Sequence, residues 1–295
     1  MGGVSEVYQK TESVFSLHSS IKRGKMKASG ENFHLSKWFL DFTSDKGEAM
    51  IFYAAKLTWH GWSITYSSWL AYDPIAGVSL KSSIRNVQMP RLSADIVTWS
   101  DLKFGISGRW KSMAAMLQTR IFETEDGYVE WTCYQPASKV NLCIKEKLLE
   151  GIGYVEKLTL TIPPWKIPMD ELRWGRFISN DNKLVWIELR EKVLQQWVWL
   201  NGERLNTCIV EDDQINIPEK NMVLDLNREV VLESEKKIVS LAEKFIRYIP
   251  GINKLIPMKF LMADEFKWLS KAVLKIDSKT INTAYAIHEL VNFKA

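Results

Sequence analysis

The sequence has few of the features that mark a well-defined biochemical class. Its 295 residues include only four histidines and three cysteines, Cys133, Cys143 and Cys208. No two cysteines have CxxC spacing, so neither a disulfide framework nor a structural zinc site is expected. No apolar run reaches the roughly eighteen residues of a membrane span. GxGxxG, P-loop, GxSxG and HExxH motifs are also missing, so we predict no metal and no NAD, flavin, ATP or haem.

An excess of basic charge is missing from most of the chain. The sequence has 39 Lys and Arg against 35 Asp and Glu, and residues 1–30 carry five basic and two acidic residues. The remainder is therefore nearly neutral, which argues against nucleic-acid binding. Residues 1–30 are predicted to be a polar tail, with weak contact to a membrane surface as the alternative. Without a signal-peptide pattern we expect a cytoplasmic protein, and its oligomeric state stays open.

Aromatic residues are abundant, with 13 Trp, 12 Phe and 9 Tyr. From Phe33 onward, short alternating or aromatic-rich runs follow one another and are separated by turn residues. Asp126-Gly127 and Asn201-Gly202 are strong hairpin signals because these pairs favour the tight turns of antiparallel strands. Regular short strands with turns between them predict an all-β sandwich or barrel.

The pattern of strands restarts after Gly151, so we predict two β modules, over 31–150 and 151–295. One segment differs, because the apolar residues across Glu235–Ile249 recur at helical spacing and predict one amphipathic helix in the second module. Closed barrels of eight to ten strands are wide enough to hold one small apolar ligand.

Two segments of the second module and its last strand resemble a known family. They are Gly151-Ile-Gly-Tyr-Val-Glu156 and its continuation to Trp165, Met169-Asp-Glu-Leu-Arg-Trp-Gly-Arg-Phe177, and Ala284-Tyr-Ala-Ile-His-Glu289. The chain resembles the two-lipocalin-domain family that includes carotenoid 1,2-hydratases (hydroxyneurosporene synthases), and it is similar to cyclases of the Diels–Alderase type.

The resemblance implies two lipocalin-like antiparallel modules in tandem and an apolar substrate. Such a substrate would be an isoprenoid, a polyene or a polyketide-like molecule that undergoes cyclisation, isomerisation or hydration without a cofactor. The chain departs from the family where Glu156-Lys-Leu-Thr159 replaces an Asp-His-Asn-Trp-Gly stretch, and where Leu172 replaces an aromatic residue. Carotenoid hydration is therefore not carried over residue by residue.

Three residues are candidates for catalysis. Alternation along a strand places Glu156 on the same face as Tyr154, where burial would raise its pKa and suit it to protonate an alkene or enol. The alternative is a cross-strand ion pair with Arg173 or Arg176. Arg176 could hold a substrate oxygen or lock the two modules together. His288 is a natural proton shuttle, or a buried hydrogen-bonded residue.

Aromatic side chains are the candidates for binding a planar, unsaturated substrate. The expected substrate-binding residues are Trp62, Tyr66, Trp69, Tyr154, Trp165 and Trp174. Packing of an ordinary core is the alternative for all of them.

Three functions follow from these residues. The first is a cofactor-independent enzyme, which needs an ionisable group in its pocket. The second is a carrier of an apolar compound, with a dry aromatic cavity. The third is a structural or partner-binding protein, whose own side chains fill every cavity.

Overall fold

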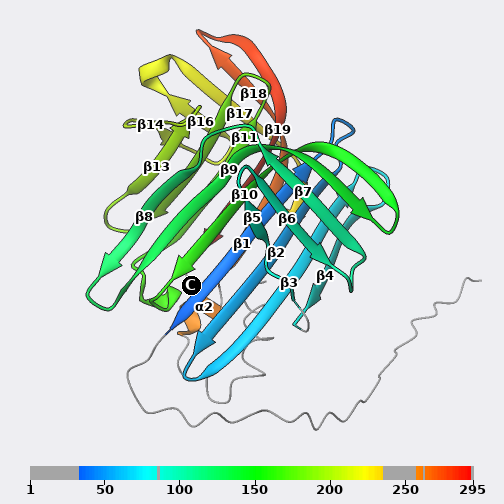
Figure 1. The fold of residues 1–295 in the computed structure, drawn as a ribbon. Helices are drawn as coiled ribbons and strands as arrows, with labels where there is room; N and C mark the ends of the chain where they lie inside the picture. Colours follow the sequence, from blue (N-terminus) through cyan, green and yellow to red (C-terminus); the bar gives the residue numbers. More distant parts are fainter. Residues whose placement is uncertain (1–32, 85–86, 235–256, 262, 294–295) are drawn as a thin grey trace, which may run out of the picture. The chain divides into compact units, whose positions relative to one another are not determined.

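The computed structural model describes residues 33–84, 87–234, 257–261 and 263–293, and these form antiparallel β-strands for the most part (Figure 1). Residues 31–295 form one compact unit. The tail expected over 1–30 and the helix expected over Glu235–Ile249 lie outside the described residues. The prediction of an all-β chain is confirmed.

The first sheet has ten strands in the order β4-β3-β2-β1-β10-β9-β7-β6-β5, with β8 pairing with β9. Its strands are β1 (His34–Thr43), β2 (Ala49–Trp59), β3 (Trp62–Asp73), β4 (Gly77–Ser83), β5 (Arg91–Ser93), β6 (Ile96–Asp101), β7 (Ile106–Ser112), β8 (Leu117–Thr124), β9 (Gly127–Ile144) and β10 (Lys147–Leu160).

The second sheet has nine strands in the order β14-β13-β12-β11-β19-β18-β17-β16-β15. Its strands are β11 (Glu171–Ile178), β12 (Lys183–Arg190), β13 (Gln195–Leu200), β14 (Glu203–Leu205), β15 (Ile209–Val210), β16 (Gln214–Ile217), β17 (Met222–Glu233), β18 (Asp264–Ile276) and β19 (Lys279–Asn292). The short helical segments are η1 (Pro164–Lys166), η2 (Pro218–Lys220) and α2 (Met258–Leu261). None of the helices in the described ranges is long and apolar enough to cross a bilayer.

The two sheets share one topology. In each sheet the first strand pairs with the last, β1 with β10 and β11 with β19. Apart from β8, the other strands follow outward on both sides in chain order. The expected pair of lipocalin-like antiparallel modules in tandem is therefore confirmed. β10 runs through the expected boundary at Glu150–Gly151 and pairs within the first sheet, and the second sheet begins at Glu171. The limits of the two domains stay a prediction.

Turn residues end the strands as the sequence predicts. Asp126-Gly127 connects β8 to β9, and Asn201-Gly202 connects β13 to β14. Asn201 and Gly202 have φ angles of 53° and 87°, and positive values at both residues fit the type I′ turn that Asn-Gly pairs favour. β10 ends at Leu160, just before Pro163-Pro164, because proline cannot donate to a strand ladder.

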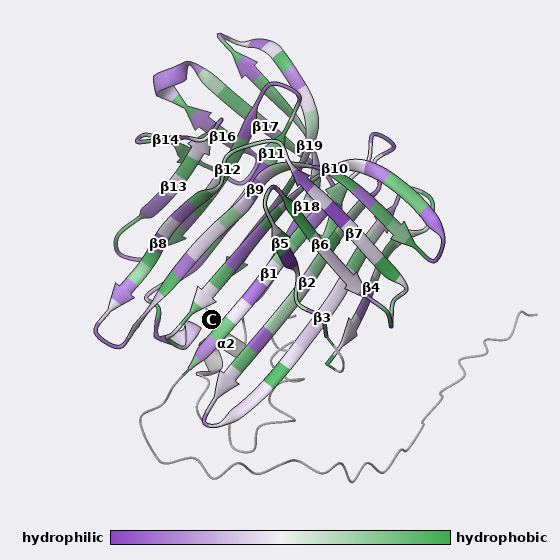
Figure 2. Ribbon diagram, viewed as in Figure 1, coloured by the Kyte–Doolittle hydropathy of each residue, from purple (hydrophilic) through white to green (hydrophobic). Residues whose placement is uncertain are grey.

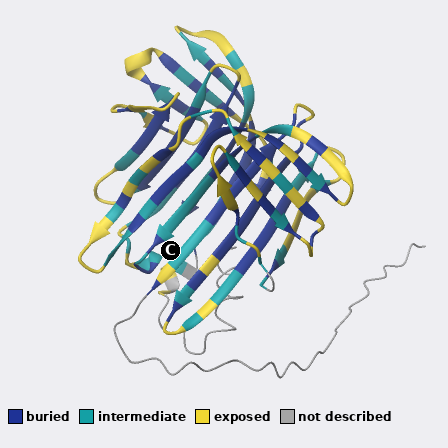
Figure 3. Cartoon of the chain, in the orientation of Figure 1, coloured by how far each residue is buried: buried dark blue, intermediate teal, exposed yellow. Residues whose placement is uncertain are grey.

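Alternation along the strands creates three apolar layers. In β2, Phe52 and Ala54 face a core made by the first sheet alone, together with Trp110. A second core belongs to the second sheet alone and includes Trp186. Tyr53 and its neighbours on the opposite face of β2 belong to a third layer, to which both sheets contribute. Figure 2 shows hydrophobic and hydrophilic residues following one another along the strands. Figure 3 shows that β1 and β2 are mostly buried, while exposed residues gather at turns and outer strands.

Candidate functional site

The layer between the two sheets contains a cavity of about 380 Å³. This volume lies in the usual range for small-molecule sites. Its walls come from both sheets and are largely apolar. Representative lining residues are Phe39, Tyr53 and Trp131 from the first sheet, and Trp174, Ile187 and Leu189 from the second.

One part of the wall is an aromatic cluster. Trp165 of η1 lies 5.4 Å from Trp59 and 6.0 Å from Phe260, measured between ring centroids. Phe33 meets both Trp59 and Trp165 edge to face. Rings in these tilted and edge-to-face arrangements form a rigid apolar surface on which a flat or folded hydrocarbon can pack.

Glu156 is the carboxyl group that projects into this cavity from β10. The pairing of β10 with β9 shifts register on both sides of Val155, between Gly153 and Glu156. Such bulges redirect side chains and are common beside functional sites. Glu156 remains on the face of Tyr154 and Leu158, as alternation predicts.

Neutral donors hold the Glu156 carboxyl. Its Oε2 atom accepts hydrogen bonds from Trp131 Nε1 at 2.5 Å, Tyr154 Oη at 2.6 Å and Trp174 Nε1 at 3.0 Å. Among the residues that the structure describes, none hydrogen-bonds to Oε1 of Glu156. The side chain keeps some exposed surface, and that surface lines the cavity. One oxygen is therefore fixed, and the other has no hydrogen-bond partner within the described part of the chain.

Burial raises the pKa of Glu156, and this effect outweighs the three donors and the more distant Lys37, which all act to lower it. Removing a carboxylate from water favours its neutral form. A carboxyl group with a raised pKa can donate a proton near neutral pH, and its ionised form is a stronger base. The site can therefore move a proton to or from a molecule in the cavity.

A cluster of one lysine and three glutamates borders the same cavity. Lys267 is fully buried, and its Nζ makes ion pairs with Glu233 at 3.1 Å and with Glu265 and Glu289 at 3.0 Å. Burial acts to lower the pKa of Lys267, but Glu289 and the other acids outweigh it and raise that pKa well above its ordinary value. All three glutamates line the cavity, so this part of the wall offers mainly hydrogen-bond acceptors.

The structure places the three predicted catalytic residues apart. Only Glu156 lines the cavity. Arg176 is fully buried and makes a bidentate ion pair with Asp41, at 2.8 Å and 2.9 Å, and also donates to the Tyr285 carbonyl oxygen at 2.8 Å. This geometry fits the alternative in which Arg176 locks the two modules together.

His288 lies on the other face of the second sheet. Its Nε2 is 2.8 Å from Ser270 Oγ, and its ring stacks on Trp268 at 5.1 Å. Burial, together with the nearby Arg228, lowers the pKa of His288 to about 3. The residue fits the alternative of a buried, hydrogen-bonded histidine.

The alternative prediction for Glu156, a cross-strand ion pair with Arg173 or Arg176, is wrong. Arg173 instead pairs with Glu171 and Asp212, both at 2.6 Å. The reason is alternation, since Arg173 points to the opposite face from Trp174 and so away from Glu156.

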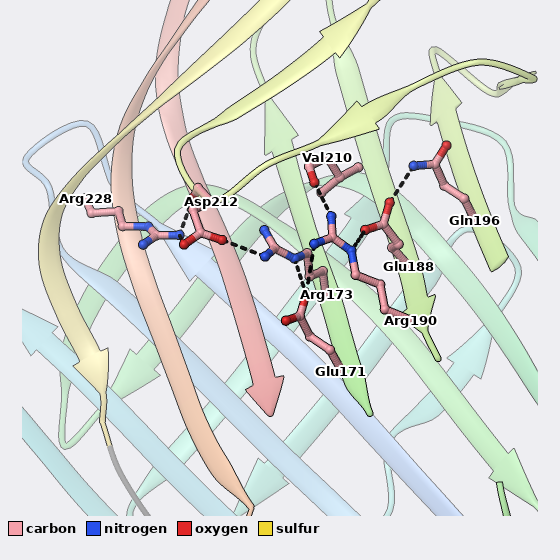
Figure 4. A network of polar contacts seen from close by, with 8 residues as sticks. All are labelled: Glu171, Arg173, Glu188, Arg190, Gln196, Val210, Asp212 and Arg228. Atoms are coloured by element: carbon pink, nitrogen blue, oxygen red, sulfur yellow. Dashed lines mark hydrogen bonds and ion pairs between the residues drawn. The ribbon is translucent and has the colours of Figure 1, made fainter. Parts of the chain in front are cut away.

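Figure 4 shows the polar network on that opposite face. Its charged members are Glu171, Arg173, Glu188, Arg190, Asp212 and Arg228, and each makes at least one ion pair with another member. Arg190 also donates to the Val210 carbonyl oxygen, and Gln196 donates to Glu188. These charged groups therefore pair with one another on the face of the sheet that points away from the cavity.

Half of the expected substrate-binding aromatics line the cavity. These are Tyr66, Trp165 and Trp174. Tyr154 lies behind Glu156 and donates to it. Trp62 and Trp69 are outside the lining, and Trp69 belongs to the core of the first sheet, with Lys81 over its ring at 5.0 Å.

Several residues of the site were not predicted from sequence. They are Lys37, Trp131, Glu233, Glu265, Lys267 and Glu289. A signal existed for Lys267, because a lysine inside the apolar strand Phe266–Leu269 requires buried partners. For the other five residues, alternation along a strand does not indicate which face of the sheet borders a cavity. Within the described ranges, no group of three or more His, Cys, Asp or Glu side chains is arranged to hold a metal ion.

No protein-family model matches the chain, and no curated protein matches it significantly in sequence. Solved structures do match. A candidate AttH protein from Nitrosomonas europaea has a TM-score of 0.51 at 7% identity, over 90% of this chain and 93% of that one. CghA in complex with Sch210972 has a TM-score of 0.50 at 10% identity, over 88% of each chain. Kievitone hydratase from Nectria haematococca is matched with a TM-score of 0.49 at 11% identity, over 89% of each chain. At such low identities, the first two likenesses show that this chain has the same tandem β-module fold.

Proposed function

We propose that the protein is an enzyme that binds an apolar small molecule between its two sheets and uses Glu156 as the acid–base group. The substrate class is an isoprenoid, polyene or polyketide-like compound, and the reaction is a cyclisation, isomerisation or hydration. The observation that carries this proposal is the Glu156 carboxyl itself. It lies in the wall of an aromatic cavity with one oxygen fixed by three donors, and its other oxygen has no hydrogen bond to a described residue.

The apolar walls supply the first part of catalysis. A flexible polyene bound against Trp131, Trp174 and the Trp165 cluster loses most of its conformers before the chemical step. Holding reacting carbons close together removes an entropic cost from the barrier.

Glu156 supplies the second part. Its raised pKa keeps a proton available for an alkene or enol, and its fixed Oε2 atom orients Oε1 toward the bound molecule. Proton transfer from a positioned side chain typically accelerates a reaction by about 10²–10⁴-fold.

The structural neighbours support small-molecule binding by this fold. The structure of CghA was solved with Sch210972. A carrier of an apolar compound is the second candidate function, and the largely apolar lining favours it. A carrier would not need a carboxyl group with an open oxygen in its wall.

The test begins with native mass spectrometry of the protein purified from its own host, followed by organic extraction of any bound compound. The extract, and fractions of host metabolites, are then incubated in D₂O with wild type and with Glu156→Gln. Glu150→Gln is the matched control, because Glu150 lies on the same strand but is exposed and outside the cavity.

We expect wild type and Glu150→Gln to convert a compound and place deuterium on one of its carbons. Glu156→Gln should be slower by about 10²–10⁴-fold while still binding the compound. Equal rates in wild type and Glu156→Gln would contradict the acid–base role. Retention of a compound without conversion by any variant would support the carrier instead.

A further inference from the structure

Lys37 is a lysine of the cavity wall that the chemistry above does not use. It lies on β1 opposite Leu158 of β10, so it is the diagonal neighbour of Glu156 on the same face of the sheet. Its Nζ atom is 4.7 Å from the centroid of the Tyr53 ring. Lys37 also acts to lower the pKa values of both Glu156 and Glu265, so its charge lies near both carboxyls.

The side-chain donors of Lys37 are available to a ligand in the cavity. Lys37 is half-buried, its Nζ lies over the Tyr53 ring, and its side chain makes no hydrogen bond or ion pair with the residues that the structure describes. An ammonium group has three N–H donors. Lys267, by contrast, is fully buried and has its ammonium surrounded by three glutamates.

The remaining charged groups of the wall cannot do the work of Lys37. Glu233, Glu265 and Glu289 only accept hydrogen bonds when ionised, so they do not bind a carbonyl oxygen of a ligand. The charged donor for a carbonyl oxygen on an otherwise apolar molecule is therefore Lys37, which lines the same cavity as Glu156.

We infer that Lys37 binds a carbonyl oxygen of the substrate, and that the substrate is a conjugated carbonyl compound such as an enone. This inference rests on the proposed function and names its substrate class. The ammonium is a charge-assisted donor to the oxygen, and it stabilises negative charge that develops there during proton transfer at carbon.

The simplest reaction of this kind needs no other reactant. The ionised Glu156 removes a proton from the γ-carbon of an enone, and the C–H electron pair moves through the double bond to the carbonyl oxygen. The resulting dienolate oxygen lies beside Lys37. Glu156 then returns the proton to the α-carbon, the carbonyl re-forms, and the double bond has moved by one position.

The test compares two probes that differ only at the carbonyl group. Benzylideneacetone is a planar enone, and the phenylbutene with a methylene group in place of the carbonyl is its hydrocarbon analogue. Because Trp59, Trp131, Trp165 and Trp174 line the cavity, tryptophan fluorescence can report the binding of both probes. The proteins are wild type, Lys37→Met, Lys37→Arg and Lys157→Met.

Lys157 is the matched control. It is a lysine on the neighbouring strand β10 with its Nζ 5.8 Å from the centroid of the Trp38 ring, and it lies outside the cavity lining. Lys157→Met therefore removes a lysine over an aromatic ring without changing the site. Thermal melting of each variant shows whether it is folded.

We expect wild type and Lys157→Met to bind the ketone more tightly than the hydrocarbon. Lys37→Met should lose about tenfold or more in affinity for the ketone and stay within about twofold for the hydrocarbon. Lys37→Arg retains the charge and should keep most of the preference. The inference is overturned if wild type shows no preference for the ketone, or if Lys37→Met keeps that preference.

This binding test does not depend on turnover. If Lys37→Met loses the ketone preference while Glu156→Gln converts compounds as fast as wild type, the role of Lys37 stands and the acid–base role of Glu156 falls. If Glu156→Gln is inactive and the ketone preference is absent, the proposed function stands and the inference about Lys37 falls.

Discussion

Asp41 and Glu156 are two buried carboxyl groups on paired strands, and both take part in the layer between the sheets. Asp41 on β1 is fully buried and receives both arms of the Arg176 guanidinium from β11. Glu156 on β10 receives two indoles and one phenol instead, and it borders the cavity. One carboxylate has a full counter-charge and the other has only neutral donors.

This difference in partners distinguishes a structural carboxylate from one that can act on a ligand. A carboxylate with a bidentate arginine has both oxygens occupied and joins the sheets, so it has nothing to offer a substrate. Burial raises the pKa of both carboxyls, but the one held by neutral donors keeps an oxygen that has no hydrogen bond to a described residue. The same residue class thus serves two roles within one layer, and the partner decides which.

The largest effect is expected from breaking the ion pair. Arg176→Met leaves Asp41 buried without a counter-charge, which should lower the free energy of unfolding by about 3–5 kcal/mol. Urea unfolding followed by circular dichroism measures this change. Adding Asp41→Leu to that variant should restore much of the loss, and a loss below about 1 kcal/mol in the single variant would show that the pair does not hold the sheets together.

A smaller effect on stability is expected from substitutions that compare the packed core of the first sheet with the cavity. Ala54 and Ala55 are adjacent in β2, but Ala54 belongs to the core of the first sheet and Ala55 lines the cavity. We expect Ala54→Phe to cost about 1–3 kcal/mol by overpacking, and Ala55→Phe to cost less than about 1 kcal/mol because its ring enters the cavity.

The same pair of variants tests the site itself. Ala55→Phe should abolish tryptophan quenching by benzylideneacetone, and Ala54→Phe should preserve it if the variant folds. Equal destabilisation by both variants, with binding intact in Ala55→Phe, would mean that the ligand binds elsewhere.

The smallest effect concerns pH. Because burial raises the folded-state pKa of Glu156, the folded protein holds a proton that the unfolded chain has released above the ordinary value of 4.5. This contribution to stability is present at low pH and is lost as pH rises through the folded-state pKa. In urea unfolding between about pH 4 and pH 8, wild type should therefore lose stability relative to Glu156→Gln as the pH rises. Parallel curves would place the pKa of Glu156 at its ordinary value.

The elements of this fold could be predicted from sequence because their causes are local. Alternation and the Asp126-Gly127 and Asn201-Gly202 turns identified the strands and two hairpins. Alternation also put Glu156 on the face of Tyr154. These patterns need only a few neighbouring residues, and they hold whatever the rest of the chain does.

The site could be predicted only in part, because its residues meet through packing of distant strands. Arg176 and Asp41 are separated by 135 residues, and Trp131 and Glu156 by 25. Alternation shows that Trp174 and Arg176 share a face, yet one lines the cavity and the other ends in an ion pair. Only the contact of the two sheets decides between these outcomes.

The measurement that tests the account most directly is infrared spectroscopy of the Glu156 carboxyl across pH, in wild type and Glu156→Gln, with and without benzylideneacetone. The account predicts a protonated-carboxyl band that is absent from Glu156→Gln, persists above the ordinary pKa of glutamic acid, and shifts when the ketone binds. If wild type and Glu156→Gln give the same spectra, or if the position of the band does not change when the ketone is added, Glu156 is not the acid–base group of a ligand site.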